Sequence, residues 1–253
     1  MLLIVTQNMP LCAETLKAAV LLSSLSRAFR RVWRPPAGLP PCATCSDFAR
    51  VGFLEGLQWA RLRGGAWNKL TCVYAALGGH LHVLQWLHLH GCPWDWRVCA
   101  SAAEYGHLHV LQWAREHGCE WSSRTCADAA FGGHVTVLQW ARENGCEWDN
   151  ETCASAAEGG HLTALRWARE NGCEWDETTC ALAAEGGHLT VLQWARSMQC
   201  PWDEATCDCA SECGHLHVLQ WARSNGCPWN RDRCLEASAG NALIQQWIQA
   251  QPP

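Results

Sequence analysis

Apolar and polar residues follow one another along most of the chain in the order expected of two short helices and a break. Within residues 148–174, Asp149 is placed to cap a first, alanine-rich helix, because its carboxylate can accept from the amides of the first turn. Gly159 and Gly160 end that helix, since its last turn needs residues that tolerate left-handed backbone. A second helix is predicted over about 162–171, where apolar residues recur three and four apart on one face. The pattern therefore predicts a helical hairpin.

The same hairpin recurs at a regular spacing of about 27 residues. A tryptophan of the second helix marks the repeat, at Trp59, Trp86, Trp113, Trp140, Trp167, Trp194 and Trp221. A second tryptophan register, two cysteine ladders and one histidine ladder share this period. A hairpin of this size cannot bury its apolar face alone, so the hairpins must stack on one another. The sequence thus predicts an all-α solenoid of about eight helical hairpins over residues 42–253.

The repeat also accounts for an unusual composition. The 253 residues include 17 Trp and 18 Cys but only 2 Tyr and 4 Phe. Fourteen of the cysteines and 15 of the tryptophans lie on the ladders, which indicates packing rather than chemistry at those positions. The chain is also much longer than the mini-domains that depend on disulfides, so a small disulfide scaffold is excluded.

The repeat resembles the ankyrin repeat in four stretches, which are Glu151–Ala157, Gly160-His161, Leu162–Ala168 and Gly172-Cys173-Glu174. They match the family's first helix, its Gly-His corner, its second helix and its exit. The likeness extends over most of the chain, from about Pro40 to Pro253. Two features depart from the family: the Thr-Pro step of the first helix is absent, and the period is 27 residues instead of the usual ~33. The missing residues fall in the family's hairpin finger.

The resemblance implies structural roles for the ladders. Cys153 takes the place of a core leucine and Cys173 that of a small exit alanine, which suits a residue that behaves as a small hydrophobe. Trp167 and Trp175, which represent the two tryptophan ladders, take the places of a core leucine and a core valine. His161 is expected to hydrogen-bond the backbone of the adjacent turn. A catalytic centre needs one constellation, whereas these residues recur six times or more.

Two metal hypotheses arise from the cysteines and histidines. The repeated Cys-x6-Cys-x7-His pattern offers ligand types, but its spacing is wider than that of zinc fingers. The unrepeated cluster of Cys209, Cys213 and His217 is the better candidate for a zinc or thiol-redox site, because Cys209 and Cys213 lie four apart on one helix face. Neutral variation at half-exposed positions is the alternative, and no cofactor is assigned.

The sequence contains no phosphate-binding loop, nucleophile elbow, paired-carboxylate arrangement or His-Glu-x-x-His helix, which argues against an enzyme. With little left of the finger, the resemblance implies a scaffold that binds another protein through its first helices. Contact residues are expected where the repeats differ, at Ser101, Asp128, Ser155, Leu182 and Cys209, and near the corner at Glu104, Phe131, Glu158, Glu185 and Glu212. Phe131 and Leu182 are expected to be apolar anchors within an acidic rim.

Charge is divided unevenly along the chain. Residues 1–41 carry a net charge of +4 and the remainder −9, for a total of −5. The acidic repeats repel phosphate, so no nucleic-acid partner is expected. No apolar run reaches 18 residues, and the arginines follow the first apolar segment rather than precede it, so neither a membrane span nor a secretory signal is expected. The predicted location is the cytoplasm or nucleus, with an organelle transit peptide as the alternative.

Residues 1–34 do not fit the repeat and are predicted to form a short helical segment. The stretch 16–33, which ends Ser26-Arg27-Ala28-Phe29-Arg30-Arg31-Val32-Trp33, resembles the second half of an F-box. This resemblance implies a substrate adaptor whose residues 1–34 dock a ubiquitin-ligase core. The alternative is a basic amphipathic cap on the first repeat. Residues 35–41 are rich in proline and predict a stiff linker.

Overall fold

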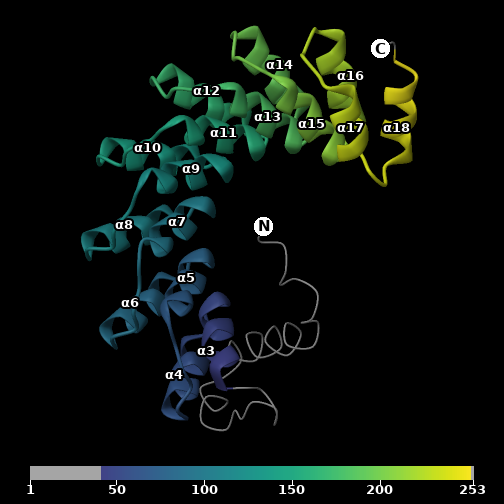
Figure 1. Cartoon of the computed structure of the whole chain (residues 1–253). Coiled ribbons are helices and arrows are strands. Elements are labelled where there is room, and N and C mark those ends of the chain that lie inside the picture. Colours follow the sequence, from purple (N-terminus) through teal and green to yellow (C-terminus); the bar gives the residue numbers. More distant parts are fainter. Residues whose placement is uncertain (1–40, 252–253) are drawn as a thin grey trace. The chain divides into compact units, whose positions relative to one another are not determined.

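The computed structural model describes residues 41–251, which form α-helices α3 to α18 joined by short turns (Figure 1). The all-α fold predicted from the sequence is confirmed. Within this range the chain forms two compact units, residues 41–98 with 109–119 and residues 99–108 with 120–251. The predictions made for residues 1–34, and those for the linker up to residue 40, lie outside the described residues.

The first unit contains helices α3 to α6 and most of α8. Their bounds are α3 (Pro41–Arg50), α4 (Leu54–Leu62), α5 (Lys69–Leu77), α6 (Leu81–Leu89) and α8 (Leu108–Glu116). Helix α3 packs against both α4 and α5, and α5 packs against α6. Pro41, the last residue of the predicted linker, begins α3, in keeping with the preference of proline for the first helical turn.

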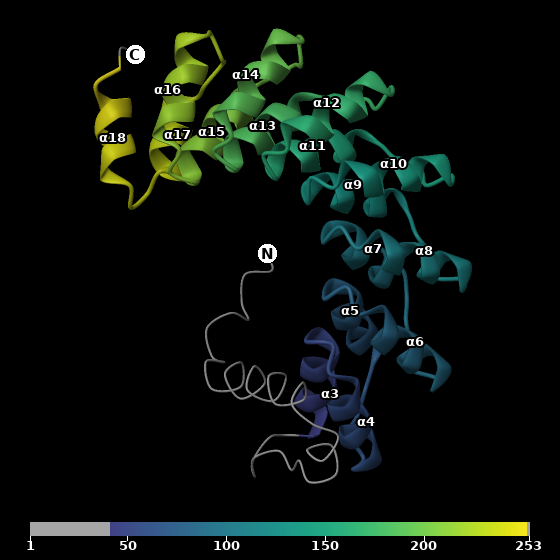
Figure 2. The same cartoon turned by 180° about the vertical axis from the view of Figure 1, so that it is seen from behind.

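The second unit contains most of α7 and helices α9 to α18. Their bounds are α7 (Arg97–Glu104), α9 (Ser123–Phe131), α10 (Val135–Glu143), α11 (Asn150–Glu158), α12 (Leu162–Glu170), α13 (Glu177–Glu185), α14 (Leu189–Ser197), α15 (Glu204–Glu212), α16 (Leu216–Ser224), α17 (Arg231–Ala237) and α18 (Ala242–Gln249). The first helices of successive hairpins, α9, α11, α13, α15 and α17, pack side by side in chain order. The second helices, α10, α12, α14 and α16, form a separate row along one side of the first helices (Figures 1 and 2).

The ends of the helices follow from their capping residues. Asp149 precedes α11 in extended backbone, and its carboxylate accepts a hydrogen bond from the amide of Glu151 at 3.1 Å. Asp176 and Asp203 cap α13 and α15 in the same way. Gly160 follows α11 with φ +76°, the left-handed backbone that glycine adopts without strain. The predicted bounds of this hairpin therefore lie within one residue of the observed ones.

The core is built mainly from alanine, cysteine, valine and leucine side chains of both rows of helices. In the hairpin α11–α12, Cys153, Ala156, Ala157, Leu165 and Ala168 are fully buried. Both cysteine ladders are buried throughout the described residues, as the resemblance implied. The cysteines at the exits of the second helices do more than fill space. The thiol of each donates a hydrogen bond to a backbone carbonyl oxygen at the start of the first helix of the same repeat. The pairs are Cys92–Asn68, Cys119–Asp95, Cys146–Ser122, Cys173–Asp149, Cys200–Asp176 and Cys227–Asp203, with Sγ–O distances of 3.2 to 3.5 Å.

The placement of the tryptophans in the core was wrong. None of the tryptophans between residues 41 and 251 is buried; both ladders are half-buried along one edge of the hairpins. Within a repeat the two rings meet edge to face, as Trp148 and Trp167 do at 5.7 Å between ring centroids. Alanine, cysteine, valine and leucine side chains fill the space between the helices of these hairpins, which leaves no room for an indole ring. Matching the tryptophans to the leucine and valine positions of the ankyrin repeat does not reveal that an indole ring is too large for those positions.

The corner histidines link neighbouring repeats, as expected. The ring Nε2 of His215 donates to the carbonyl oxygen of Glu185 at 2.9 Å, and that of His80 donates to Arg50 at 3.1 Å. The ring of His215 also covers Gly187, where a Cβ would lie 2.6 Å from it. Glycine at this corner is therefore required both by its φ of +73° and by the ring of the next repeat.

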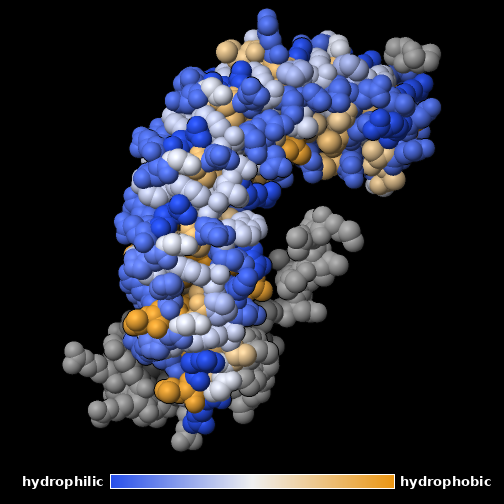
Figure 3. All heavy atoms as spheres, turned by 60° about the vertical axis from the view of Figure 1, so that its left-hand side comes forward, coloured by the Kyte–Doolittle hydropathy of each residue, from blue (hydrophilic) through white to orange (hydrophobic). Residues whose placement is uncertain are grey.

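The surface seen in Figure 3 is mostly hydrophilic, with isolated hydrophobic side chains. The most exposed large apolar side chains of the described residues are Leu62, Leu89 and Leu243. None of the helices in this range has the length and apolar content needed to cross a membrane.

Candidate functional site

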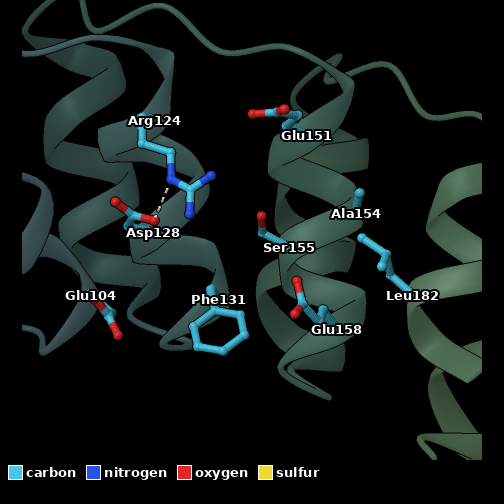
Figure 4. A pocket seen from close by; sticks show the side chains of 9 residues that line it. All are labelled: Glu104, Arg124, Asp128, Phe131, Glu151, Ala154, Ser155, Glu158 and Leu182. Carbon is cyan, nitrogen blue, oxygen red and sulfur yellow. Dashed lines mark hydrogen bonds and ion pairs between the residues drawn. The ribbon is translucent and has the colours of Figure 1, made fainter. Parts of the chain in front are cut away.

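A pocket of about 270 Å³ opens on the first helices of the second unit. It lies mainly between α9 and α11, with contributions from α7 and α13 (Figure 4). Its walls are formed by Glu104, Arg124, Asp128, Phe131, Glu151, Ala154, Ser155, Glu158 and Leu182. The face of the first helices predicted to contact a partner is therefore hollowed at this point.

Helical spacing brings these side chains together. Arg124, Asp128 and Phe131 are four and three residues apart on α9, so they lie along one face of that helix. Glu151, Ser155 and Glu158 have the same spacing on α11. Because successive hairpins share one period, corresponding positions of adjacent helices lie opposite one another. Figure 4 shows the two sets facing each other across the pocket.

The pocket has an apolar part. Phe131 is 38% exposed, Leu182 is half-buried, and Ala154 is a buried residue of the wall. Glu104, Glu158, Glu185 and Glu212 occupy the position of Phe131 in the other hairpins of this unit from α7 to α15. The aromatic ring is thus a departure from the repeat at the pocket itself.

The polar part of the pocket is strongly acidic. Glu104, Asp128, Glu151 and Glu158 contribute four carboxylates, and Arg124 is the only cationic side chain among the lining residues. The guanidinium Nε of Arg124 lies 2.9 Å from a carboxylate oxygen of Asp128, with which it forms an ion pair. One cation therefore faces four acidic groups.

Burial raises the pKa of three of these carboxylates. The side chain of Asp128 is 13% exposed, and this burial raises its pKa to about 6 even though Arg124 opposes the shift. Burial also raises the pKa of Glu104. The pKa of Glu158 is raised by burial and, to a smaller extent, by the nearby carboxylate of Glu185. The fold holds carboxylates here at a cost, which is typical of functional sites.

Six of the ten predicted contact residues meet in this pocket. They are Glu104, Asp128, Phe131, Ser155, Glu158 and Leu182. The other four, Ser101, Glu185, Cys209 and Glu212, belong to the same positions of the repeat but do not line it.

Three lining residues were not predicted. Arg124 and Glu151 share one repeat position, one helical turn before Asp128 and Ser155, and that position also varies between repeats. The variation at that position is the sequence signal that identifies them. Ala154 occupies a position where four consecutive repeats, from Ala100 to Ala181, carry alanine, so variation between neighbouring repeats gives no signal there.

The cysteine cluster offers little reactive chemistry. Cys209 is half-buried on α15, and burial raises the pKa of its thiol to about 11. Cys213 is exposed, and its thiol pKa is also raised, by desolvation first and then by the charge of Glu185. The ring of His217 donates to the carbonyl oxygen of Gly187 at 3.3 Å. Between residues 41 and 251 no group of three or more His, Cys, Asp or Glu side chains is placed to hold a metal ion, so the zinc hypothesis finds no ligand set here.

A second pocket, of about 370 Å³, lies on the first unit between the ends of α4 and α6. Its walls include Arg61, Trp67, Trp86 and His90. Arg61 covers the ring of Trp67, Trp67 meets Trp86 edge to face, and His90 stacks on Trp86. Since the pairing of arginine and tryptophans recurs in other repeats, this pocket belongs to the repeated edge and is the weaker candidate for a specific site.

The fold is similar to that of a solved ankyrin repeat domain. The crystal structure of the human ASB11 ankyrin repeat domain superimposes with a TM-score of 0.51 at 16% sequence identity, and the match covers 72% of this chain and 98% of that one. No protein-family model matches the chain, and no curated protein matches it by sequence. The structural likeness shows the fold. The chain is therefore an all-α, ankyrin-like solenoid built from helical-hairpin repeats of about 27 residues.

Proposed function

We propose that this chain is a non-enzymatic scaffold that binds another protein through the first-helix face of its second unit. The observation that carries the proposal is the convergence in one pocket of six residues that occupy two variable positions of the repeat. The ankyrin-like fold supports it, because the solenoids of repeat proteins commonly present extended binding surfaces.

Comparison between repeats separates packing from recognition. At buried positions α11 and α13 carry the same residues, as with Cys153 and Cys180 or Ala156 and Ala183. On the face that lines the pocket, Ser155 of α11 is replaced by Leu182 of α13. The core does not dictate that difference, so a requirement outside the fold is the simplest reason for it.

The chemistry of the pocket also fits binding rather than catalysis. Its only hydroxyl group among the lining residues is that of Ser155, and no histidine or lysine lines the pocket to activate it. Phe131 and Leu182 offer apolar contact area beside polar groups, the combination typical of protein interfaces.

The test compares the partners of three versions of the full chain. Phe131→Ala with Leu182→Ala removes the apolar part of the pocket, whereas Leu243→Ala removes an exposed leucine of α18 outside it. Affinity purification followed by quantitative mass spectrometry should show partners of the wild type that the pocket variant loses and the control keeps. Identical partner sets for all three versions would contradict the proposal.

A further inference from the structure

We propose that the pocket accepts an arginine or lysine side chain of the partner protein, with an adjacent apolar side chain of the same segment packed on Phe131 and Leu182. The inference deepens the proposed function and rests on it. It names the chemistry of the bound segment, which is a cationic residue beside an apolar one.

The charge of the pocket selects the cation. Four carboxylates face one guanidinium, and that guanidinium is already paired with Asp128 at 2.9 Å. An anionic segment would meet Glu104, Glu151 and Glu158 without compensation. A guanidinium or ammonium group would form charge-assisted hydrogen bonds with them, which are the stronger kind in proteins.

The arrangement of the walls selects the neighbouring apolar residue. Phe131 stands one turn beyond Asp128 on α9, and Glu158 stands across the pocket on α11 (Figure 4). A cationic side chain that reaches the carboxylates would lay its aliphatic stem beside the ring of Phe131. The next apolar side chain of the segment then reaches Leu182 on α13.

The occupied pocket should depend on pH. Asp128 faces Arg124 on its own helix, Glu104 on α7 and Glu151 on α11. A cation favours the ionised carboxylate, whereas the buried Asp128 of the free protein binds a proton below a pKa of about 6. Binding should therefore release protons near pH 6, and affinity should rise as the pH increases from 5 to 7.5.

The experiment uses the full chain and fluorescein-labelled ten-residue peptides. One peptide places arginine two residues before leucine in a Gly-Ser background, and its matched partner carries glutamine in place of arginine. Fluorescence anisotropy at pH 7.5 should show that the arginine peptide binds at least about tenfold more tightly than the glutamine peptide. This ratio corresponds to the free energy of one charge-assisted hydrogen bond. Asp128→Asn should remove most of this preference, because it takes one carboxylate from the pocket and leaves the charge of Arg124 to offset Glu104 and Glu158. The thermal melting point of each variant checks that it is folded.

The matched control is Glu212→Gln. Glu212 occupies the position of Phe131 and Glu158 in another repeat, but it does not line the pocket. Its substitution should change the affinity of the arginine peptide by less than about twofold. An equal effect of Glu212→Gln and Asp128→Asn would mean that general charge attracts the peptide, and it would overturn the inference.

Three further results would overturn it. The first is equal affinity of the wild type for the arginine and glutamine peptides, and the second is no binding of either peptide up to millimolar concentration. The third is tighter peptide binding after Arg27, Arg30 and Arg31 are changed to Gln, which would assign the pocket to the chain's own basic segment. If the Phe131→Ala and Leu182→Ala variant still loses its partners in any of these cases, the proposed function holds and only the nature of the ligand is wrong.

Discussion

The edge of the hairpins that carries the tryptophans and the face that carries the pocket show how one repeat serves two purposes. On the edge, Arg169 lies over Trp175 at 4.2 Å from the ring centroid and donates to the carbonyl oxygen of Cys173. Arg142 over Trp148 and Arg196 over Trp202 repeat this arrangement. On the face, corresponding positions hold Asp128, Ser155 and Leu182.

The two regions also differ in how well their charges are satisfied. Each edge arginine contacts a ring and a carbonyl group, so its charge is used within the fold. In the pocket, burial raises the pKa of Asp128, Glu104 and Glu158, which means that the fold opposes their charge. Uniform repeats with satisfied groups indicate a structural role, and varied repeats with opposed charges indicate a binding role.

Truncation of a core side chain should have the largest effect on the free energy of unfolding. Because the edge and the face share this core, the effect should not distinguish them. Leu165 of α12 is fully buried between the rows of helices. Leu165→Ala should lower the free energy of unfolding by about 3 kcal/mol, because it removes buried apolar contacts and leaves a cavity. Chemical denaturation measures the loss. A loss below about 0.5 kcal/mol, the value expected for the exposed control Leu243→Ala, would contradict the assigned core.

Asp128→Asn should have the opposite effect, because it should raise the free energy of unfolding at neutral pH. The folded-state pKa of about 6 lies above the ordinary aspartate value of 3.8, so the native protein binds more protons than the unfolded chain between these two pH values. Stability of the wild type should therefore fall as the pH rises from about 4 to 6. The variant should show a weaker dependence, because Glu104 and Glu158 keep their raised pKa values, and it should be more stable at pH 7.5 by roughly 1–3 kcal/mol.

Denaturation curves at pH 4.5 and 7.5 for the wild type and Asp128→Asn test this sign. Glu170→Gln, at an exposed position of α12, is the control and should leave both curves nearly unchanged. A variant less stable than the wild type at pH 7.5 would show that the ion pair with Arg124 outweighs the cost of burial. Asp128 would then be a structural residue, and the contrast between face and edge would weaken.

Loss of one edge arginine should have the smallest effect. Arg169→Gln removes the stacking on Trp175 and the hydrogen bond to Cys173 and should lower the free energy of unfolding by about 0.5–1 kcal/mol. Partner binding at the pocket should be unaffected. Denaturation combined with the partner assay separates the two outcomes, and a lost partner with unchanged stability would assign recognition to the edge.

The fold was largely predictable because local signals agree in most repeats. The carboxylate of Asp149, the glycines of the corner and the apolar spacing of the second helix each act within a few residues, and the period confirms them. The place of the tryptophans was not predictable in this way. It depends on the volume available between stacked helices. The alignment of Trp167 with a leucine gives no information on that volume.

The pocket was predictable in part for a related reason. Variation between repeats identifies Asp128 and Phe131 as positions that the core does not fix, but it gives no such signal at Ala154, because the neighbouring repeats also carry alanine there. The depth of the pocket and the raised pKa of Asp128 depend on how side chains of neighbouring helices close over the carboxylate. The distances between the side chains of neighbouring helices follow from packing, and the periodicity of the sequence does not specify them.

Site-specific photo-crosslinking tests the central claim most directly. A photoreactive phenylalanine analogue would replace Phe131 on the face in one version of the chain and Met198, an exposed residue after α14, in the other. The predicted result is a crosslinked partner from position 131 that is absent from position 198 and that Asp128→Asn weakens. A partner captured from position 198 and not from position 131 would contradict the account.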